Sequence, residues 1–527
     1  METKINHGPV GGMVVVPRIA PKKSKHYNIY TGICSNVRFG AHSNTLQNIQ
    51  RAVAERVLYV PSPSGGLQSC PKPKSKGYLF NLMQPFHRQF QKIVSNDTSF
   101  PIPPLSDELF CSTYIGAKKK RYEDACESLL RESATQKDAK IKSFVKIEKI
   151  NFSSKPDPAP RIIQPRTFRY SAALGKIIKH LEKPLFKTIK EIFGGPTVLK
   201  GLDCVGQAKA LEDMWNQFDN PVAIGLDASR FDQHCSVEML EWEQTIWPMM
   251  TTSKRQLKRL MKMQLYNHGT AYVEDGKVKY TTNGSRMSGD MNTSSGNCLI
   301  MCAMVWTYCR SLGITKFRLA NNGDDCILIV ESKHLNPVTK NLNTYFTSLG
   351  YTMKMDKPVY EFEQISFCQT QPVFDGVRYR MCRDPRVAMA KDLCCLLNIT
   401  TDNHKMKVWH NAMRCGGLAL TSGIPCWQSF YTMFPSTDEK VGRKEMTLNN
   451  LYESGMFRMI TSDKTLFSST ITDEARFSFW KAFGILPDDQ KLLEDRFNIM
   501  SLSNCTRNDS QDYDELSLLV ENLPLSR

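Results

Sequence analysis

The sequence predicts an α+β fold. Short runs rich in β-branched residues and bounded by turn residues occur at 222–226, 317–320 and 326–330. Apolar residues recur with helical periodicity over 237–250 and 293–310. Strands and helices are mixed without a regular strand–helix–strand alternation, which is the pattern expected of the α+β class.

The composition changes along the chain and indicates its coarse organisation. Residues 1–28 are rich in Pro, Gly and Lys and are expected to form a flexible basic arm, and 61–76 a linker or long loop. Helices are predicted over 118–137 and over much of 385–500. The acidic, polar stretch 508–515 is expected to belong to a mobile tail.

The charge of the chain favours a polyanionic partner. The 527 residues include 69 Lys+Arg and 52 Asp+Glu, a net charge of +17. A basic protein gains affinity for nucleic acid because neutralising phosphates releases condensed counterions. The alternative is that the positive charge serves only to keep the protein soluble. With 41% hydrophobic and 10% aromatic residues, pervasive disorder is excluded.

The cysteines and the apolar stretches exclude two other classes. The 17 cysteines are scattered without zinc-site spacing, so reduced thiols in the core are expected. The longest nearly apolar stretch, Cys298–Trp306, is far shorter than the roughly 20 residues that cross a bilayer. No transmembrane segment is predicted.

Two adjacent aspartates, Asp324 and Asp325, stand between two apolar β runs. A tight hairpin is expected there, with Asn322 and Gly323 able to take positive φ. Adjacent carboxylates repel each other, and a bound cation is one way to stabilise them. Taken alone, Gly-Asp-Asp is common enough by chance that an exposed turn is the simpler explanation.

Two further polar segments precede this hairpin. In the stretch 225–234, Asp227 ends a predicted strand and Asp232 follows five residues later at a helix entry. The polar loop 288–297 runs into an apolar helix. Each segment alone also has a structural explanation, a helix cap for Asp232 and a helix N-terminus for the loop.

Together and in this order, the segments match the needs of nucleotidyl transfer. That reaction uses two Mg²⁺ ions about 4 Å apart, one at the attacking 3′-hydroxyl and one at the triphosphate. Asp227 on one strand and Asp324 on a neighbouring hairpin could bridge both ions. Hard oxygen ligands favour Mg²⁺, with Mn²⁺ as a substitute, and argue against zinc.

The sequences GLDASRFDQH, SGDMNTSSGN and NGDD resemble motifs A, B and C of the viral RNA-dependent RNA polymerases. Within these, the chain resembles the tombusvirus family, including its luteovirus-like and umbravirus-like branches. The resemblance covers roughly residues 140–400 and implies a right-hand fold of fingers, palm and thumb.

The resemblance also implies domain boundaries. Residues 1–105 would form an N-terminal basic arm and fingers-associated extension, and 106–220 the fingers with a basic NTP-gripping motif. The palm would span 221–370, with motifs A to E and part of the fingers interleaved. The thumb would span 371–505, and 506–527 would form an acidic mobile tail.

The resemblance implies a role for the residues of motifs A to C. Asp227, Asp324 and Asp325 would be the catalytic metal ligands, Asp325 coordinating less directly. Asp232 would sense the ribose 2′-hydroxyl, which discriminates because a nucleotide lacking it leaves buried polar groups unpaired. The other members of that network would be Ser288, Thr293 and Asn297.

Upstream, 144–149 and 158–166 resemble the fingers motif that grips the incoming triphosphate. The residues expected to neutralise its phosphates are Lys146, Lys149 and Arg161, although each alone could be a solvated surface charge. Arg166 and Arg169 are assigned instead to the template backbone.

Downstream, 350–358 resembles motif D, whose lysine protonates the leaving pyrophosphate. Lys357 fits the spacing better and Lys354 is the alternative. The segment 366–369 resembles motif E, a hairpin between palm and thumb.

Other classes explain less of the sequence. A reverse transcriptase would place a bulky aromatic where Asp232 stands, and a hydrophobic residue where Gly323 stands. A two-metal nuclease needs no ribose-sensing set. A non-catalytic RNA-binding replication protein explains the charge but leaves three ordered motifs to coincidence. The favoured function is therefore an RNA-dependent RNA polymerase that replicates a positive-strand RNA virus genome, adding NTPs to an RNA 3′ end.

The expected partners are template and product RNA, NTPs and a membrane anchor. Replicases of this family usually carry an N-terminal membrane-anchoring region, which is not seen in these 527 residues. The chain is therefore expected to be the downstream part of a readthrough or frameshift product. An anchored viral replication protein or an N-terminal extension would hold it at membrane-associated replication complexes in the host cytoplasm.

Overall fold

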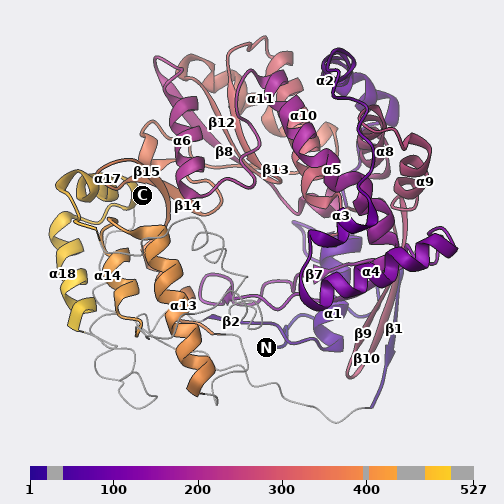
Figure 1. Ribbon diagram of the computed structural model, residues 1–527, viewed down its shortest axis with the longest axis horizontal. Coiled ribbons are helices and arrows are strands. Elements are labelled where there is room, and N and C mark those ends of the chain that lie inside the picture. The colour runs from indigo at the N-terminus through magenta and orange to yellow at the C-terminus, as the bar shows by residue number, and fades with distance from the viewer. Residues whose placement is uncertain (20–38, 396–402, 436–468, 500–527) are drawn as a thin grey trace.

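The computed structural model describes residues 1–19, 39–395, 403–435 and 469–499 (Figure 1). It mixes helices and sheets, which confirms the α+β class. The elements form three groups: a four-stranded sheet flanked by helices, a five-stranded sheet with its neighbouring helices, and a helical group near the end of the chain (Figure 1).

The four-stranded sheet contains all three strands predicted from the sequence. Its strand order is β11-β12-β8-β13, and every neighbouring pair is antiparallel. The strands are β11 (Arg318–Asn322), β12 (Asp325–Glu331), β8 (Pro221–Ala228) and β13 (Met353–Met355).

Alternation along β8 and β12 sends side chains to two different environments. One face, with Ile224 and Leu226 of β8, packs into the main hydrophobic core. The helices of that core include α2 (Lys76–Asn96), α5 (Phe168–Phe193), α8 (Val237–Ile246), α10 (Thr293–Ser311) and α11 (Leu335–Ser348).

The opposite face of the same strands is covered only at one end. There Ala223 and Ile329 pack with α6 (Cys204–Trp215) in a smaller core. The strand register continues this face to Asp227 and Asp325 at the other end. The two aspartates therefore lie on the side of the sheet away from the main core.

A two-residue loop, Gly323-Asp324, joins β11 to β12 as a tight hairpin. Gly323 has a φ of 86°, which only glycine adopts at low cost. Asn322 is a strand residue without positive φ. The predicted hairpin is confirmed, but the left-handed position is Gly323 alone.

The five-stranded sheet has the order β1-β10-β9-β5-β7. Its strands are β1 (Met13–Pro17), β10 (Gly276–Asn283), β9 (Tyr266–Val273), β5 (Ile141–Val145) and β7 (Ile162–Ile163). Across this sheet pack α1 (Leu46–Val53) and a following π-helical turn, Ala54–Leu58.

The expectation of a flexible arm at residues 1–28 is wrong for its first 19 residues. β1 pairs with β10, and the Thr3 hydroxyl donates to Asp157 at 3.0 Å. The run Met-Val-Val-Val has strong β propensity, which outweighs the Pro, Gly and Lys content of the segment. Residues 20–38 lie outside the described residues.

The other sequence-predicted elements need smaller corrections. The expected loop 61–76 contains a hairpin of β3 (Tyr59–Pro61) and β4 (Leu67–Ser69). The helix predicted over 118–137 is α4 (Gly116–Arg131), which ends at the extended residue Glu132.

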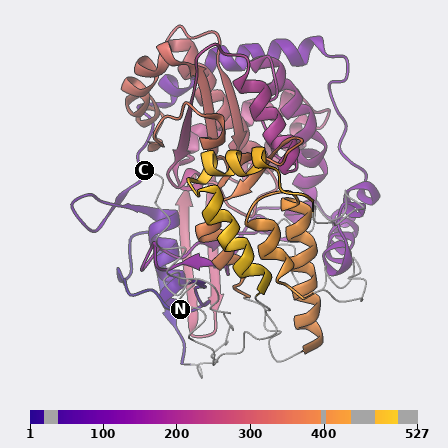
Figure 2. The same ribbon diagram turned by 90° about the vertical axis from the view of Figure 1, so that its left-hand side faces the viewer.

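The C-terminal group forms a second core. It contains the hairpin β14 (Thr370–Phe374) and β15 (Tyr379–Arg383), followed by α12 (Pro385–Asp392), α13 (Asn403–Thr421), α14 (Trp427–Thr432), α17 (Asp473–Phe483) and α18 (Pro487–Ile499). Figure 2 shows its helices side by side in front of the rest of the molecule. The predicted helices of 385–500 are confirmed where this range is described, and the acidic tail at 508–515 lies outside it.

The cysteines of the described residues are free thiols, and most are buried, as expected of core thiols. Among the described helices, none is both long enough and apolar enough to cross a bilayer.

Candidate active site

The aspartates of motifs A and C meet across two adjacent strands. Asp227 on β8 is the register partner of Asp325 on β12 and, on its other side, of Lys354 on β13. Register partners direct their side chains to the same face of a sheet. Asp325, Asp227 and Lys354 therefore form a row, and Asp324 stands next to it in the hairpin loop.

The three aspartates at this end of the sheet, Asp227, Asp324 and Asp325, concentrate negative charge. Asp227 and Asp324 are exposed and Asp325 is half-buried. Desolvation by the surrounding protein raises the pKa of Asp324, and the charge of Asp227 raises it further. Desolvation, with added repulsion from Asp324 and Asp227, raises the pKa of Asp325 to about 6. A cation at this position would relieve the repulsion.

Asp325 has a second partner that the sequence did not reveal. Its Oδ2 accepts a hydrogen bond of 2.9 Å from the backbone N–H of Cys368. Cys368 and Gln369 have φ of 52° and 62°, and backbone hydrogen bonds between Phe367 and Thr370 close the turn around them. Left-handed turn positions usually carry Gly or Asn, so neither residue type signals this geometry. The turn is the segment that resembles motif E.

The carboxylates suit Mg²⁺, whose remaining ligands are water and substrate, better than a metal ion bound by protein side chains alone. Within the described ranges, no three His, Cys, Asp or Glu side chains are grouped so as to hold a metal ion. Mg²⁺ characteristically uses one or two carboxylates and completes its shell with water and substrate phosphates. Asp227 and Asp324 supply such a pair, whereas Asp325 is engaged by Cys368.

Asp232 and Asn297 are brought together as expected. Asn297 Nδ2 donates to Asp232 Oδ1 at 2.7 Å. Asp232 lies in the first turn of α7 (Phe231–His234), but Arg230 is the N-cap residue, so Asp232 is not a cap. Desolvation raises the pKa of Asp232, and the charge of Asp324 contributes to the increase while Asn297 opposes it. The Asp232 carboxylate is therefore within electrostatic range of the hairpin.

A buried ion pair behind Asn297 was missed from the sequence. Arg286 Nε donates to Asn297 Oδ1 at 3.1 Å, and Arg286 pairs with Glu243 of α8 at 2.5 Å, both side chains being 1% exposed. Gly296 allows this approach, because a Cβ there would lie 2.4 Å from Glu243 Oε1. An arginine just before the motif B loop and a glycine inside an apolar helix were the available signals.

The two hydroxyls expected in the same network have other partners. Ser288 Oγ donates to the carbonyl of Ile162 at 3.1 Å and accepts from the N–H of Gln164 at 3.2 Å. Thr293 Oγ1 donates to the carbonyl of Met287 at 2.6 Å. Both hydroxyls therefore hold the motif B loop in place and do not contact Asp232 or Asn297.

Two of the expected phosphate-gripping residues converge on one carboxylate. Lys146 and Arg161 pair with Glu148 at 2.8 and 3.2 Å, and the Lys146 N–H donates to the Arg161 carbonyl. The charge of Arg161 lowers the pKa of Asp324 and of Asp232, against the dominant effect of desolvation. Arg161 therefore lies within electrostatic range of the carboxylates.

The other basic residues of this region have protein partners. Lys149 Nζ donates to the carbonyl of Lys391 at 3.0 Å. Arg166 forms a buried ion pair with Asp290 at 2.6 Å, and Arg169 pairs with Asp138 at 3.1 Å. The assignment of Arg166 and Arg169 to the template backbone thus has no support from their contacts.

Of the two motif D lysines, the one that lies beside Asp227 is not the one that the sequence spacing favoured. Lys354 is opposite Asp227, whereas Lys357 follows Asp356, whose N–H donates to the carbonyl of Gly225. Lys357 is therefore displaced along β8, away from its aspartate end. The sequence spacing favoured Lys357, but the register brings Lys354 beside Asp227.

Comparison with known proteins places this chain in a family. A model of the family described as viral RNA dependent RNA polymerase matches residues 13–504. The chain is 42% identical to the RNA-directed RNA polymerase of Tobacco necrosis virus (strain A) over 492 residues, which cover 93% of this chain and 66% of that protein.

Two further relatives have the same description. The RNA-directed RNA polymerases of Tomato bushy stunt virus (strain Cherry) and Cucumber necrosis virus are each 42% identical over 92% of this chain. The chain covers 57% and 58% of their respective lengths. The resemblance carried by motifs A, B and C is confirmed, and the chain belongs to the viral RNA-dependent RNA polymerase family.

Proposed function

We propose that this chain is the catalytic part of an RNA-directed RNA polymerase that replicates the genome of a positive-strand RNA virus. The observation that carries the proposal is the row of Asp325, Asp227 and Lys354 beside the Gly323-Asp324 turn. The Asp232–Asn297 contact and the relatives named RNA-directed RNA polymerase support it independently.

The same proposal assigns the three groups of elements to a right hand. The four-stranded sheet and its helices correspond to the palm, the five-stranded sheet to the fingers, and the C-terminal helices to the thumb (Figure 1). The pairing of β9 and β10 with β1 and β5 supports the expectation that part of the fingers interrupts the palm sequence. It also supports the assignment of the N-terminal residues to a fingers-associated extension.

Asp227 and Asp324 would hold the two Mg²⁺ ions. When bound, such ions activate the attacking 3′-hydroxyl and neutralise charge on the triphosphate. The chain itself orients the carboxylates: Gly323 allows the tight hairpin, and the N–H of Cys368 fixes Asp325. Asp325 thereby sets the position of β12 rather than acting as the first ligand.

The nucleotide would be recognised at its triphosphate and at its ribose. Lys146 and Arg161 would bind the phosphates, and Glu148 between them keeps the two cations close despite their repulsion. Asp232, oriented by Asn297, would accept a hydrogen bond from the ribose 2′-hydroxyl. Lys354 would donate the proton to the leaving pyrophosphate, with Lys357 as the alternative.

The partners of the complete protein are part of the proposal. Template RNA, product RNA and NTPs follow from the reaction. A membrane-anchored viral replication protein, or an N-terminal extension of this chain, would bring it to replication complexes on host cytoplasmic membranes.

The test is nucleotide incorporation by the purified chain on an RNA template with Mg²⁺. Asp324→Asn should abolish incorporation, because the amide cannot replace the carboxylate charge, yet leave RNA binding nearly unchanged. Asp213→Asn on α6, an exposed aspartate paired with Lys209, is the matched control and should keep the parent rate. Normal synthesis by Asp324→Asn would refute the two-metal assignment. RNA binding without incorporation by the parent would favour the non-catalytic alternative.

A further inference from the structure

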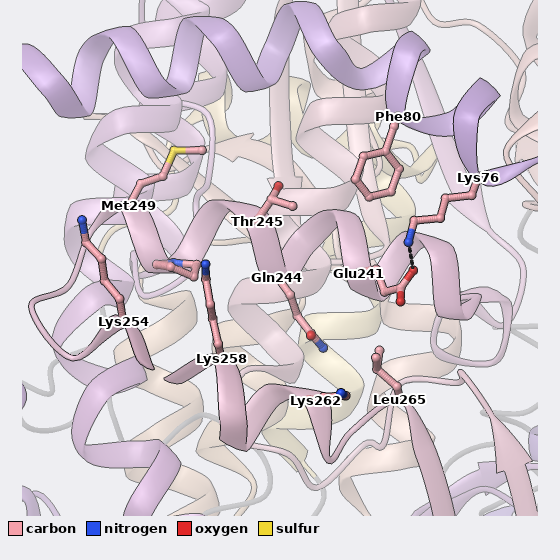
Figure 3. Close-up of a pocket in the computed structure, with 11 residues that line it drawn as sticks. Lys76, Phe80, Glu241, Gln244, Thr245, Met249, Lys254, Lys258, Lys262 and Leu265 are labelled. Atoms are coloured by element: carbon pink, nitrogen blue, oxygen red, sulfur yellow. Dashed lines mark ion pairs between the residues drawn. The ribbon is translucent and has the colours of Figure 1, made fainter. Parts of the chain in front are cut away.

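A groove rimmed by lysines lies between α2, α8 and α9 (Lys254–Lys262) (Figure 3). It has a volume of about 600 Å³. Inner residues of α8 and α9, such as Trp242 and Leu257, belong to the main core beneath the four-stranded sheet. The groove is therefore separated by that core from the sheet face that carries Asp227.

Three lysines of α9 form one edge of the groove. Lys254, Lys258 and Lys262 are spaced four residues apart, so they lie on one face of the helix at about 6 Å intervals (Figure 3). All three are exposed, and among the described residues no carboxylate pairs with them. Leu257 and Leu260 hold the other side of α9 in the core. Like charges at this spacing repel each other, and an anionic ligand would offset the repulsion.

The rest of the groove lining combines apolar side chains, one of them an aromatic ring, with the polar Gln244 and Thr245 of α8 (Figure 3). Phe80 and Met249 are half-buried and Leu265 is buried. Lys76 Nζ lies 5.5 Å from the centre of the Phe80 ring and pairs with Glu241 at 2.7 Å. Glu241, the only carboxylate among the described residues that line the groove, is thus paired with Lys76 and not with a lysine of α9.

We propose that this groove binds single-stranded RNA outside the active site. Evenly spaced cations suit a polymer with evenly spaced phosphates, and the Phe80 ring, which lies beside Lys76 in the same groove, suits a base that stacks without sequence preference. A lipid surface fits less well, because membrane-associated helices insert projecting apolar side chains, whereas the apolar lining residues Phe80, Met249 and Leu265 are half-buried or buried. RNA binding here goes beyond the proposed polymerase function, because it requires no catalysis.

The test detects contact at the groove itself in the full chain. Photoactivatable p-benzoylphenylalanine replaces Phe80, and the probe is a labelled oligouridylate of about twenty nucleotides. The same analogue at Phe477 is the matched control, because Lys481 lies at the same 5.5 Å from that ring and α17 contains no other lysine. Strong crosslinking at position 80 and little at position 477 are expected.

The lysines are then removed without changing helix propensity greatly. The groove variant is Lys254→Gln/Lys258→Gln/Lys262→Gln, and the control Lys183→Gln/Lys187→Gln/Lys190→Gln removes three exposed charges from α5. Each phosphate contact contributes about 0.7 to the salt slope of single-strand binding, so three lost contacts lower it by about 2. Between about 50 and 200 mM salt, crosslinking of the parent should therefore fall roughly 15- to 20-fold more than that of the groove variant.

Several results would overturn the proposal. Equal crosslinking at positions 80 and 477 would show that RNA does not prefer the groove. An equal loss of crosslinking in the α5 variant and the groove variant would show that only the overall charge of the protein matters. Capture by phosphatidylserine vesicles that needs the α9 lysines, with RNA crosslinking unchanged, would identify a lipid site. Stronger competition by polyglutamate than by unlabelled RNA would identify an acidic protein partner. Crosslinking that persists in Asp324→Asn separates this site from the catalytic proposal.

Discussion

Replacing Arg286 by Lys tests whether the buried ion pair behind Asn297 governs the choice of sugar. The Arg286 guanidinium donates to Asn297 Oδ1 through Nε and pairs with Glu243 through Nη2. This arrangement leaves Asn297 Nδ2 to donate to Asp232. A lysine can keep the charge opposite Glu243 but lacks the fixed fork that serves both acceptors.

The size of the effect follows from the lost hydrogen bond. A buried acceptor without a partner costs about 1–3 kcal/mol, and this energy no longer favours the orientation of Asn297 toward Asp232. At about 1.4 kcal/mol for each factor of ten, the preference for rNTP over dNTP should fall by roughly 5- to 150-fold. Lysine is chosen because removing the charge would leave Glu243 unpaired, at a cost of about 3–5 kcal/mol in stability.

The measurement is kcat/KM for single-nucleotide incorporation with rNTP and with the matching dNTP. The control is Arg166→Lys, because Arg166 is also a buried arginine that pairs with an aspartate, Asp290, and donates to an asparagine, Asn267, at 2.7 Å. It has no contact with Asp232 or Asn297, so its variant should keep the parent's sugar ratio. An unchanged ratio in Arg286→Lys, alongside a reduced ratio in Asn297→Ala, would refute the orienting role of Arg286.

Two further predictions concern the same site. Asp232→Ala and Asn297→Ala should each lower rNTP use more than dNTP use; if both lose activity at the parent's ratio, they position the nucleotide without sensing its sugar. Lys354→Ala should slow incorporation by about 10²-fold or more, as expected on loss of a general acid. Lys357→Ala should keep the parent rate, and the opposite ranking would restore the assignment that the sequence favoured.

The sequence predicted those candidate site residues whose strand or turn can be recognised from the residues next to them. Asp227 ends an apolar strand, and Asp324 follows a glycine between two apolar runs, so their elements could be predicted before their contacts were known. Asp232 and Asn297 carried a similar signal through motif order. In each case the proposed chemistry needs a particular residue type at a particular place on a strand, turn or helix.

Lys354 illustrates why the rest could not be predicted. Spacing along the chain measures distance within one strand, whereas the neighbour of Asp227 depends on how β13 is aligned on β8. A shift of that register would exchange the lysine that faces the aspartates without changing the sequence pattern. The alignment is set by the backbone hydrogen bonds that Asp356 and Val359 make with Gly225 and Ala223. Backbone hydrogen bonds of this kind are not indicated by any residue type.

The Arg286–Glu243 pair shows the same limit for contacts between helices. Glu243 is one of several glutamates on α8, and only the approach of α10 at Gly296 determines that it meets an arginine 43 residues later. Burying these charges is unfavourable unless both are satisfied, and here Trp247 and Asn292 donate to the other Glu243 oxygen. Because the whole network must form together, the amide of Asn297 is held in one orientation before any nucleotide arrives. In the proposed polymerase, preorganisation of this kind would let a single 2′-hydroxyl be recognised without the cost of ordering its partner.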